Sequence, residues 1–175
     1  MIRFVKLAVV VAGVGLTLAG CSSSTKHAKL DPFAGKGSPY YTGKGPIPFG
    51  GGRYQVGKPY QVAGRWFAPK EQPNYDKEGT ASWYGEAFHK RRTSNGEWFN
   101  MNQLTAAHRT LPFGTRLQLE HAGRRVVVTV TDRGPFDRNA QGNYRKELDL
   151  AEAAFAALAP LDRGVITVQA REVLR

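Results

Sequence analysis

The sequence predicts a mainly β domain, a small barrel or sandwich, with one or two short helices. Apolar and polar residues alternate in four short stretches, each bounded by turn residues: Thr80–Tyr84, Thr115–Leu119, Arg124–Thr131 and Gly164–Ala170. The run from Val126 to Val130 is apolar on both faces, as expected for a central strand that is covered on two sides. Many short strands and few helices in this part of the chain are typical of a barrel or sandwich.

The N-terminus has the pattern of an exported lipoprotein precursor. A short basic start with Arg3 and Lys6 precedes an apolar run over residues 7–18, which is shorter than the ~20 residues that a membrane-spanning helix needs. The run ends in Leu-Ala-Gly-Cys, and Cys21, the only cysteine of the chain, lies where bacterial lipoprotein signals place the lipidated residue. The sequence therefore predicts a signal peptide over residues 1–20 and a lipid anchor on Cys21. The alternative is an ordinary signal peptide that happens to contain a cysteine.

The charge and the predicted export narrow the possible partners. The chain carries 25 Lys and Arg against 14 Asp and Glu, a formal net charge of +11. A basic balance usually points to nucleic acid first, but export argues against it, so an anionic wall or membrane surface is the expected counter-charge. Ser22 is not the aspartate that is usually linked to inner-membrane retention. We therefore expect a lipoprotein that faces the periplasm, anchored to the outer membrane, monomeric and without nucleic acid.

Two segments are expected between the anchor and the compact domain. Residues 21–52 are rich in Ser, Gly, Pro and Lys and lack apolar periodicity, which predicts a flexible tether. Residues 53–78 hold aromatic residues separated by glycines and prolines, which favours an extended arm or linker that packs on the domain. The compact domain is expected to span residues 79–175. A single cysteine allows no internal disulfide, so this domain must rest on its apolar core.

Two helices are expected within the domain. Asp149 is the predicted N-cap of the first, with Glu152 completing a D-x-x-E box and Gly164 ending the segment. The residues of its apolar face are Leu150, Ala154, Leu158 and Leu161. A second, shorter helix is expected from Asn102 to Arg109, stopping before Pro112.

Three polar positions are candidates for chemistry. Asp132 ends the most apolar strand, before a Gly-Pro turn, and a carboxyl against apolar walls tends to have the raised pKa that a general acid needs. Asp132 could equally cap the turn and pair with Arg133. Glu97, after Asn-Gly, could be a solvated turn residue, and His108, beside alanines, a hydrogen-bonded packing residue. The histidines and carboxylates lack the spacing of metal ligands, so neither a metal nor a cofactor is expected.

These residues also carry a family resemblance. The motifs are GTASWYG at residues 79–85, FH at 88–89, TSNGE at 93–97, LTAAH at 104–108, TLP at 110–112 and DRGPF at 132–136. In this order they resemble the rare lipoprotein A family, which has the double-psi β-barrel fold that it shares with expansins and one class of cellulases. The resemblance covers most of residues 79–173 and implies a six-stranded barrel.

The resemblance also implies an activity. Members of the family are lytic transglycosylases that act on peptidoglycan glycan strands, with a preference for strands lacking stem peptides, and leave 1,6-anhydro-muramyl ends. The family's functional polar positions correspond to Glu97, His108 and Asp132. Asp132 is then expected to be the acid and base, Glu97 to support the oxocarbenium-like charge or orient the sugar, and His108 to set their protonation by hydrogen bonding.

Four further residues are expected at the substrate: Tyr84 and Trp98 by stacking on sugar rings, Ser82 through its hydroxyl, and Arg133. Two features differ from the family pattern. The chain stops at Arg175 without the C-terminal glycan-binding domain of many members, which puts septal targeting by that route in question, and the loop over residues 137–147 is longer than usual. Two other functions are compatible with the same barrel, a non-catalytic expansin-like module that binds peptidoglycan, and a structural lipoprotein that tethers the envelope to the wall.

Overall fold

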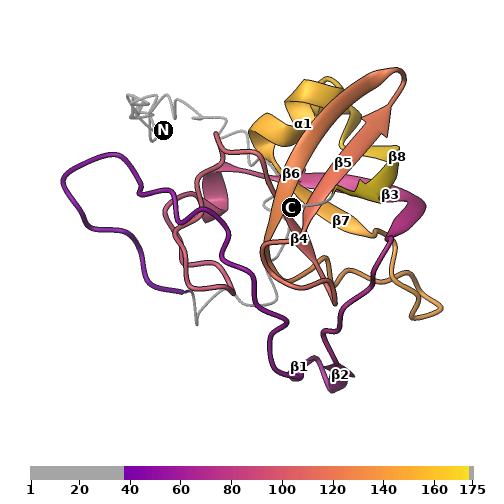
Figure 1. Cartoon of the computed structure of the whole chain (residues 1–175), viewed down its shortest axis with the longest axis horizontal. Coiled ribbons are helices and arrows are strands. Elements are labelled where there is room, and N and C mark those ends of the chain that lie inside the picture. Colours follow the sequence, from indigo (N-terminus) through magenta and orange to yellow (C-terminus); the bar gives the residue numbers. More distant parts are fainter. Residues whose placement is uncertain (1–37, 174–175) are drawn as a thin grey trace, which may run out of the picture. The chain divides into compact units, whose positions relative to one another are not determined.

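The structure, a computed structural model, describes residues 38–173, so the predicted signal peptide and Cys21 lie outside the described residues. Six strands of this part close into a barrel in the order β3-β7-β4-β6-β5-β8 (Figure 1). They are β3 (Asp76–Tyr84), β4 (Thr105–His108), β5 (Arg116–His121), β6 (Arg124–Asp132), β7 (Leu148–Ala151) and β8 (Val165–Glu172). The predicted mainly β fold with a six-stranded barrel is confirmed, and of the one or two short helices expected, this part of the chain contains one α-helix.

The barrel core is built from alternate residues of these strands. The pairs β3–β7 and β4–β6 are parallel, and the other four pairs are antiparallel. Successive side chains of a strand point to opposite faces, so Val126, Val128 and Val130 of β6 lie inside the barrel with Leu117 and Leu119 of β5. Full burial of each such side chain stabilises the fold by about 1.5–3 kcal/mol.

The predicted long helix is shorter and starts later than expected. Helix α1 spans Glu152–Leu158, and its N-cap, Ala151, makes no side-chain capping hydrogen bond. The predicted N-cap Asp149 is wrong, because this residue lies in the middle of β7. The alternation of apolar residues around Asp149 belongs to this strand, in which Leu148 and Leu150 both point into the core. Pro160 follows the helix, and Leu161 belongs to a separate 3-10 turn, Leu161–Arg163.

The predicted second helix, from Asn102 to Arg109, is wrong. Its central residues form β4, whose four residues are all buried. The strand is paired on both sides, in parallel with β6 and antiparallel with β7. Pairing on two sides and complete burial outweigh the helix propensity of two adjacent alanines.

The segment before the barrel makes ordered contacts with it. A hairpin of β1 (Tyr60–Val62) and β2 (Arg65–Phe67) forms within it. Gln55 exchanges two backbone hydrogen bonds with Phe113, and the Lys70 amide donates to the carbonyl of Thr110 at 3.0 Å. Strand β3 begins at Asp76, earlier than the expected Thr80, because the antiparallel ladder with β8 continues to Arg171. These first residues of β3 are exposed, so they lack the apolar alternation that marks a strand.

Residues 38–52, within the predicted tether, lie along the turn that contains Glu97. The Tyr41 amide donates to the carbonyl of Lys90 at 2.8 Å, and the Arg92 amide donates to the carbonyl of Pro39 at 3.2 Å. The Arg91 guanidinium lies over the ring of Tyr40 at 4.5 Å. This described part of the segment is therefore held to the domain by backbone hydrogen bonds.

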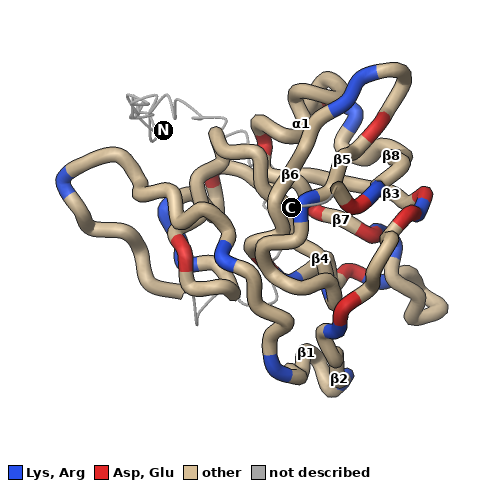
Figure 2. The backbone as a smooth tube through the Cα atoms, viewed as in Figure 1, with Lys and Arg blue, Asp and Glu red and all other residues tan. Residues whose placement is uncertain are grey.

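The charged residues of the described part do not form a patch of one sign along the backbone. Figure 2 shows Lys and Arg interspersed with Asp and Glu along the tube. Among residues 38–173, no helix is long and apolar enough to cross a membrane.

Candidate active site

A β-bulge sets the direction of Asp132. The core valines of β6 end at Val130, and strict alternation would point residue 132 into the barrel as well. However, Ala106 of β4 pairs with Val130, whereas the next residue, Ala107, pairs with Asp132. Thr131 is the extra residue of this bulge, and the changed register brings Asp132 to the face of Ala107. The bulge thus moves a carboxyl from the interior to the outer face of the barrel.

Two carboxyls flank a small residue on this outer face. Ala107 of β4 pairs with Asp132 on one side and with Asp149 of β7 on the other. Asp149 in turn pairs with Ser82 of β3. Since neighbouring strands are about 4.8 Å apart, the backbones of the two aspartates are separated by about 10 Å across the alanine. The four residues form a row across four strands, which we call the outer row.

Burial and hydrogen bonding have opposite effects on the pKa of Asp132. Its Oδ1 accepts hydrogen bonds from the Ser94 amide at 2.9 Å, the Ser94 hydroxyl at 2.5 Å and the Arg133 amide at 2.8 Å. Burial has the largest effect and raises the pKa of Asp132 above its ordinary value, although the hydrogen bonds lower it. The side chain is therefore held in a fixed orientation and keeps a proton to higher pH than an exposed aspartic acid.

Glu97 is joined to Asp132 through the turn in which it lies. The Thr93 amide donates to the Glu97 carbonyl at 2.8 Å, and the Asn95 amide donates to the carbonyl of Thr131 at 3.3 Å, at the end of β6. The Glu97 carboxylate points toward the N-terminal segment, where its Oε1 accepts a hydrogen bond from the Gly52 amide at 3.0 Å. The structure thus brings the turn of Glu97 to Asp132 and covers part of its carboxylate with residues 50–52.

The hydrogen bond from the Gly52 amide to Glu97 depends on glycine at position 52. Gly52 has φ of +67°, and a Cβ there would lie 2.4 Å from Thr129 Cγ2. We expect Gly52→Val to detach residues 38–52, because valine is strained at this φ and has no room. Trypsin should then cut after the exposed Lys44 faster than in the wild-type protein. Gly64→Val is the matched control, since Gly64 also has a positive φ, +77°, and a Cβ there meets nothing within 4 Å. Equal cleavage rates in the two variants would contradict this description of the contact.

His108 lies on the opposite face of β4 from the outer row. It pairs with Leu148, a core residue, and is 2 % exposed. Its Nδ1 accepts hydrogen bonds from the amides of Thr110 and Leu111 at 3.1 and 2.8 Å, so the ring proton is on Nε2, which donates to Glu147 Oε1 at 3.0 Å. Burial lowers the pKa of His108 and favours this neutral form. The imidazole therefore hydrogen bonds with Glu147 rather than with Asp132 or Glu97.

Glu147 is the centre of a second polar network. Its Oε2 accepts from Arg109 Nη2 at 2.6 Å, and its Oε1 also accepts from the Tyr75 hydroxyl at 3.1 Å. The hydrogen bond from His108 and the charge of Arg109 lower the pKa of Glu147 to about 2, against the opposing effect of burial. Arg109 also donates to the carbonyls of Pro135 and Lys146, so the network fixes both ends of the loop that follows Asp132.

The remaining outer-row residues are already hydrogen bonded within the protein. Ser82, 4 % exposed, donates to Asp149 Oδ1 and accepts from Lys146 Nζ at 2.7 Å. Lys146 also forms ion pairs with Asp137 at 3.2 Å and with Asp149 at 3.4 Å. The loop over residues 137–147 thus brings an ammonium group to the end of the outer row.

The other side chains that were expected to bind substrate also interact with groups of the protein. Arg133 donates to the carbonyls of Val56, Leu111 and His108 and lies over the Phe113 ring at 3.7 Å. It therefore ties the N-terminal arm to the barrel. The ring of Trp98 contacts Tyr41 at 5.7 Å and the Arg92 guanidinium at 5.2 Å. The ring of Tyr84 is stacked on Phe99 at 4.2 Å.

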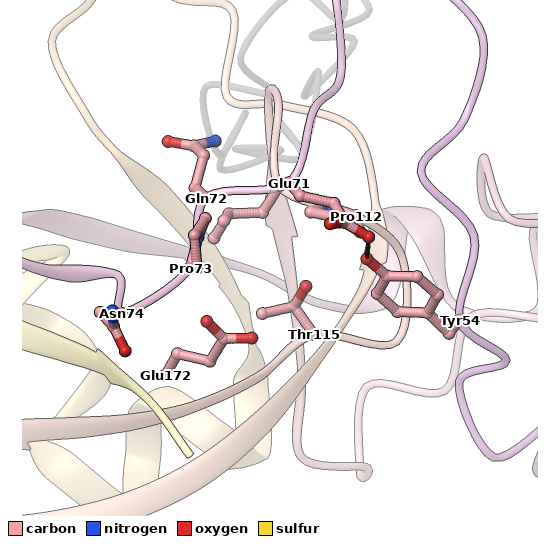
Figure 3. Close-up of a pocket in the computed structure, with 9 residues that line it drawn as sticks. Tyr54, Glu71, Gln72, Pro73, Asn74, Pro112, Thr115 and Glu172 are labelled. Atoms are coloured by element: carbon pink, nitrogen blue, oxygen red, sulfur yellow. Dashed lines mark hydrogen bonds between the residues drawn. The ribbon is translucent and has the colours of Figure 1, made fainter. Parts of the chain in front are cut away.

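A separate pocket of about 350 Å³ lies between the linker and the barrel, lined by Tyr54, residues 71–74, Pro112, Thr115 and Glu172 among others (Figure 3). None of the three predicted catalytic residues lines it. Within residues 38–173, no group of three His, Cys, Asp or Glu side chains is arranged to hold a metal ion.

The fold and the outer row together define the class of protein. An aspartic acid of raised pKa, held on the outer face of a closed six-stranded barrel at the end of its most apolar strand, is suited to acid–base catalysis. The family model described as "Lytic transglycolase" matches residues 76–170. The chain belongs to this family, that of the RlpA endolytic peptidoglycan transglycosylases, as the resemblance predicted.

Three relatives illustrate the extent of the match. "Endolytic peptidoglycan transglycosylase RlpA" of Rickettsia felis is 33% identical, over 97% of this chain and 73% of its own length. The protein of the same name from Neisseria meningitidis serogroup A is 38% identical, over 66% of this chain and 47% of its own length. "Probable endolytic peptidoglycan transglycosylase RlpA" of Synechocystis is 50% identical over 51% of this chain and 26% of its own length.

Sequence reasoning missed several residues that shape the site. Ser94 was not distinguished from the rest of its turn, although two of its groups bind Asp132. The pattern around Asp149 predicts a helix cap, whereas the residue lies in β7. Lys146 and Glu147 lie next to each other directly before β7. Two opposite charges beside an apolar strand are the sequence feature that could have marked them as site residues.

Proposed function

We propose that this chain is a lytic transglycosylase that cleaves peptidoglycan glycan strands, preferring strands without stem peptides, and leaves 1,6-anhydro-muramyl ends. Family membership supports the class of reaction. The observation that carries the proposal is the state of Asp132, a fixed carboxyl whose pKa is raised by burial. Such a carboxyl can give up a proton and take it back at one site.

The proposed reaction needs one acid. Protonated Asp132 donates its proton to the glycosidic oxygen as the bond between that oxygen and C1 breaks, which releases one strand with a free hydroxyl. The C6 hydroxyl of the remaining sugar then attacks its own C1, and Asp132 takes the proton of that hydroxyl. The acid is restored, and no water is consumed. A glycoside hydrolase, in contrast, uses two carboxyls at a defined separation.

Glu97 and His108 have supporting roles in this proposal. The carboxylate of Glu97 lies in the turn that binds Asp132, and its proposed role is to stabilise the positive charge that develops on the sugar. The contact with Gly52 would have to open for that carboxylate to meet a strand. His108 acts by position, since its hydrogen bond to Glu147 holds the end of β4, which carries Ala107 between the two aspartates.

The hydrogen bond from Ser94 gives a pH test of the proposed acid. Ser94→Ala removes the hydroxyl that lowers the pKa of Asp132 and keeps the amide donor. The pKa of Asp132 should therefore rise. Because the reaction starts from the protonated acid, activity is lost as pH rises through this pKa, and the variant should stay active to higher pH than the wild-type protein. A pH–rate profile measures this limb, and an unchanged or lower limb would argue against Asp132 as the acid.

The signal pattern that ends in Cys21 supports a proposal for where this activity takes place. We propose that the chain is exported, lipidated on Cys21 and held at the outer membrane facing the periplasm, where it would reach the wall. Labelling of cells with a radioactive fatty acid, followed by capture of the protein, tests the anchor. A Cys21→Ala protein that is still labelled would exclude this attachment.

The proposed function is tested with the full mature chain and two substrates. The protein is incubated with purified sacculi and with glycan strands stripped by an amidase, and the products are analysed by mass spectrometry. We expect anhydro ends from both, with faster release from the stripped strands. Binding to either substrate without new anhydro ends would instead support an expansin-like binding module.

A further inference from the structure

The ring of Tyr84 is enclosed by other aromatic rings. Phe99 stacks on it with a centroid distance of 4.2 Å and an angle of 19°, and Phe88 meets it edge-on at 5.8 Å. This position leaves the predicted stacking on a sugar ring without support from the structure. The part of Tyr84 that is not used for packing is its hydroxyl group.

That hydroxyl is buried and has no hydrogen-bond partner among residues 38–173. In this part of the chain only one other buried side-chain atom, Thr105 Oγ1, shares the condition. Buried polar groups in native proteins are nearly always hydrogen bonded, because an unpaired one loses its bond to water and gains nothing. The unpaired hydroxyl therefore requires an explanation.

The surroundings of the hydroxyl indicate what it could bind. Tyr84 lies two residues after Ser82 on β3, and so on the same face as the outer row. Burial, together with the charges of Asp132 and Asp149, raises the pKa of Tyr84 well above its ordinary value. The group is consequently a hydrogen-bond donor at any working pH, next to two acidic side chains.

The two acidic neighbours have donors of their own. Asp132 Oδ1 takes three hydrogen bonds from Ser94 and Arg133, and Asp149 Oδ1 is bound by Ser82 and Lys146. These bonds use one oxygen of each carboxylate, and neither carboxylate accepts a hydrogen bond from the Tyr84 hydroxyl, which has a proton to share and no acceptor among the described residues. Such an arrangement fits an acceptor oxygen that arrives with the substrate.

We propose that Tyr84 is a further catalytic residue, whose hydroxyl donates a hydrogen bond to an oxygen of the sugar that is bound between Asp132 and Asp149. This inference rests on the proposed function and adds a contact to the same site. The hydrogen bond fixes the sugar next to the acid and strengthens as negative charge moves onto oxygen in the transition state. The polyhydroxylated sugar supplies the acceptor that the free protein lacks.

The variant Tyr84→Phe tests the proposal, because it keeps the stacked ring and removes only the hydroxyl. We expect kcat for the release of anhydro ends to fall about ten-fold or more, while Tm is unchanged or higher since an unpaired buried group is removed. Thr105→Val is the matched control. It removes the other unpaired hydroxyl without changing the size of the side chain, and it should keep full activity and an unchanged or higher Tm.

A binding measurement separates this proposal from the proposed function. The Asp132→Asn protein is titrated with an amidase-stripped glycan oligosaccharide in a calorimeter, with and without Tyr84→Phe. We expect the second substitution to weaken binding about five-fold. If the wild-type protein bound this glycan but never cut it, the proposed function would fail while weaker binding by the double variant would still support the contact. Unchanged binding together with unchanged kcat would overturn the proposal, as would a Tm lowered by several degrees.

Discussion

Replacing Asp132 by asparagine is expected to slow the release of anhydro ends by about 10²–10⁴-fold, the usual contribution of a positioned acid. The amide cannot donate the proton that the leaving oxygen needs, nor accept one from the C6 hydroxyl. In the proposed reaction a single group performs both transfers, so its loss blocks both. The measurement is mass-spectrometric counting of anhydro ends from amidase-stripped glycan at equal protein concentrations.

The fold should survive this change. Asparagine keeps an Oδ1 that can accept the hydrogen bonds from Ser94 and Arg133, and it introduces no charge. Asp162→Asn is the matched control, because Asp162 is an exposed aspartate in the 3-10 turn after α1. We expect wild-type activity from the control and a wild-type Tm from both variants. Full activity of Asp132→Asn would remove the assignment of the acid.

Replacing Glu147 by alanine is expected to lower the free energy of unfolding by about 3 kcal/mol, since removing one partner of a mostly buried ion pair leaves the other uncompensated. Arg109 would keep its charge on a side chain that is only 11 % exposed, and the Nε2 proton of His108 would lose its acceptor. Urea unfolding measures the difference. Glu120→Ala is the control, because Glu120 pairs with Arg125 on the surface, where an ion pair contributes little.

The same carboxylate makes stability depend on pH. The pKa of Glu147 is lowered to about 2, from an ordinary 4.5, so the folded form binds this proton more weakly than the unfolded form. Its contribution is complete above the unfolded pKa and is lost as pH falls from about 4.5 toward 2. The wild-type protein should therefore lose more stability than Glu147→Ala across this interval. Parallel stability curves for the two proteins would show that the network is not an ionic one.

The barrel could be predicted from the sequence because its strands alternate visibly. The interior face of β6 can be recognised from Val126, Val128 and Val130 without knowledge of the neighbouring strands. The strand β4 could not be recognised in the same way. It has four residues, two of them alanine, and its identity as a strand comes from pairing with β6 and β7, which are distant in the sequence.

The site was predictable in part, for a related reason. Asp132 could be singled out because a polar residue ends an apolar strand. The bulge at Thr131 that turns this residue outward depends on the register between β4 and β6. The sequence of one strand alone does not determine that register. The hydrogen bonds of Ser82, Arg133 and His108 to protein groups depend likewise on tertiary contacts.

Cleavage of the glycan in water enriched in heavy oxygen distinguishes the proposed reaction from hydrolysis, because the proposed reaction uses the sugar's own hydroxyl in place of water. Wild-type protein is incubated with amidase-stripped strands, and each new end is weighed by mass spectrometry. We predict that the new ends are anhydro sugars that contain no heavy oxygen. Reducing ends that carry the heavy isotope would contradict the account, since they would show that water, and hence a hydrolytic mechanism, breaks the strand.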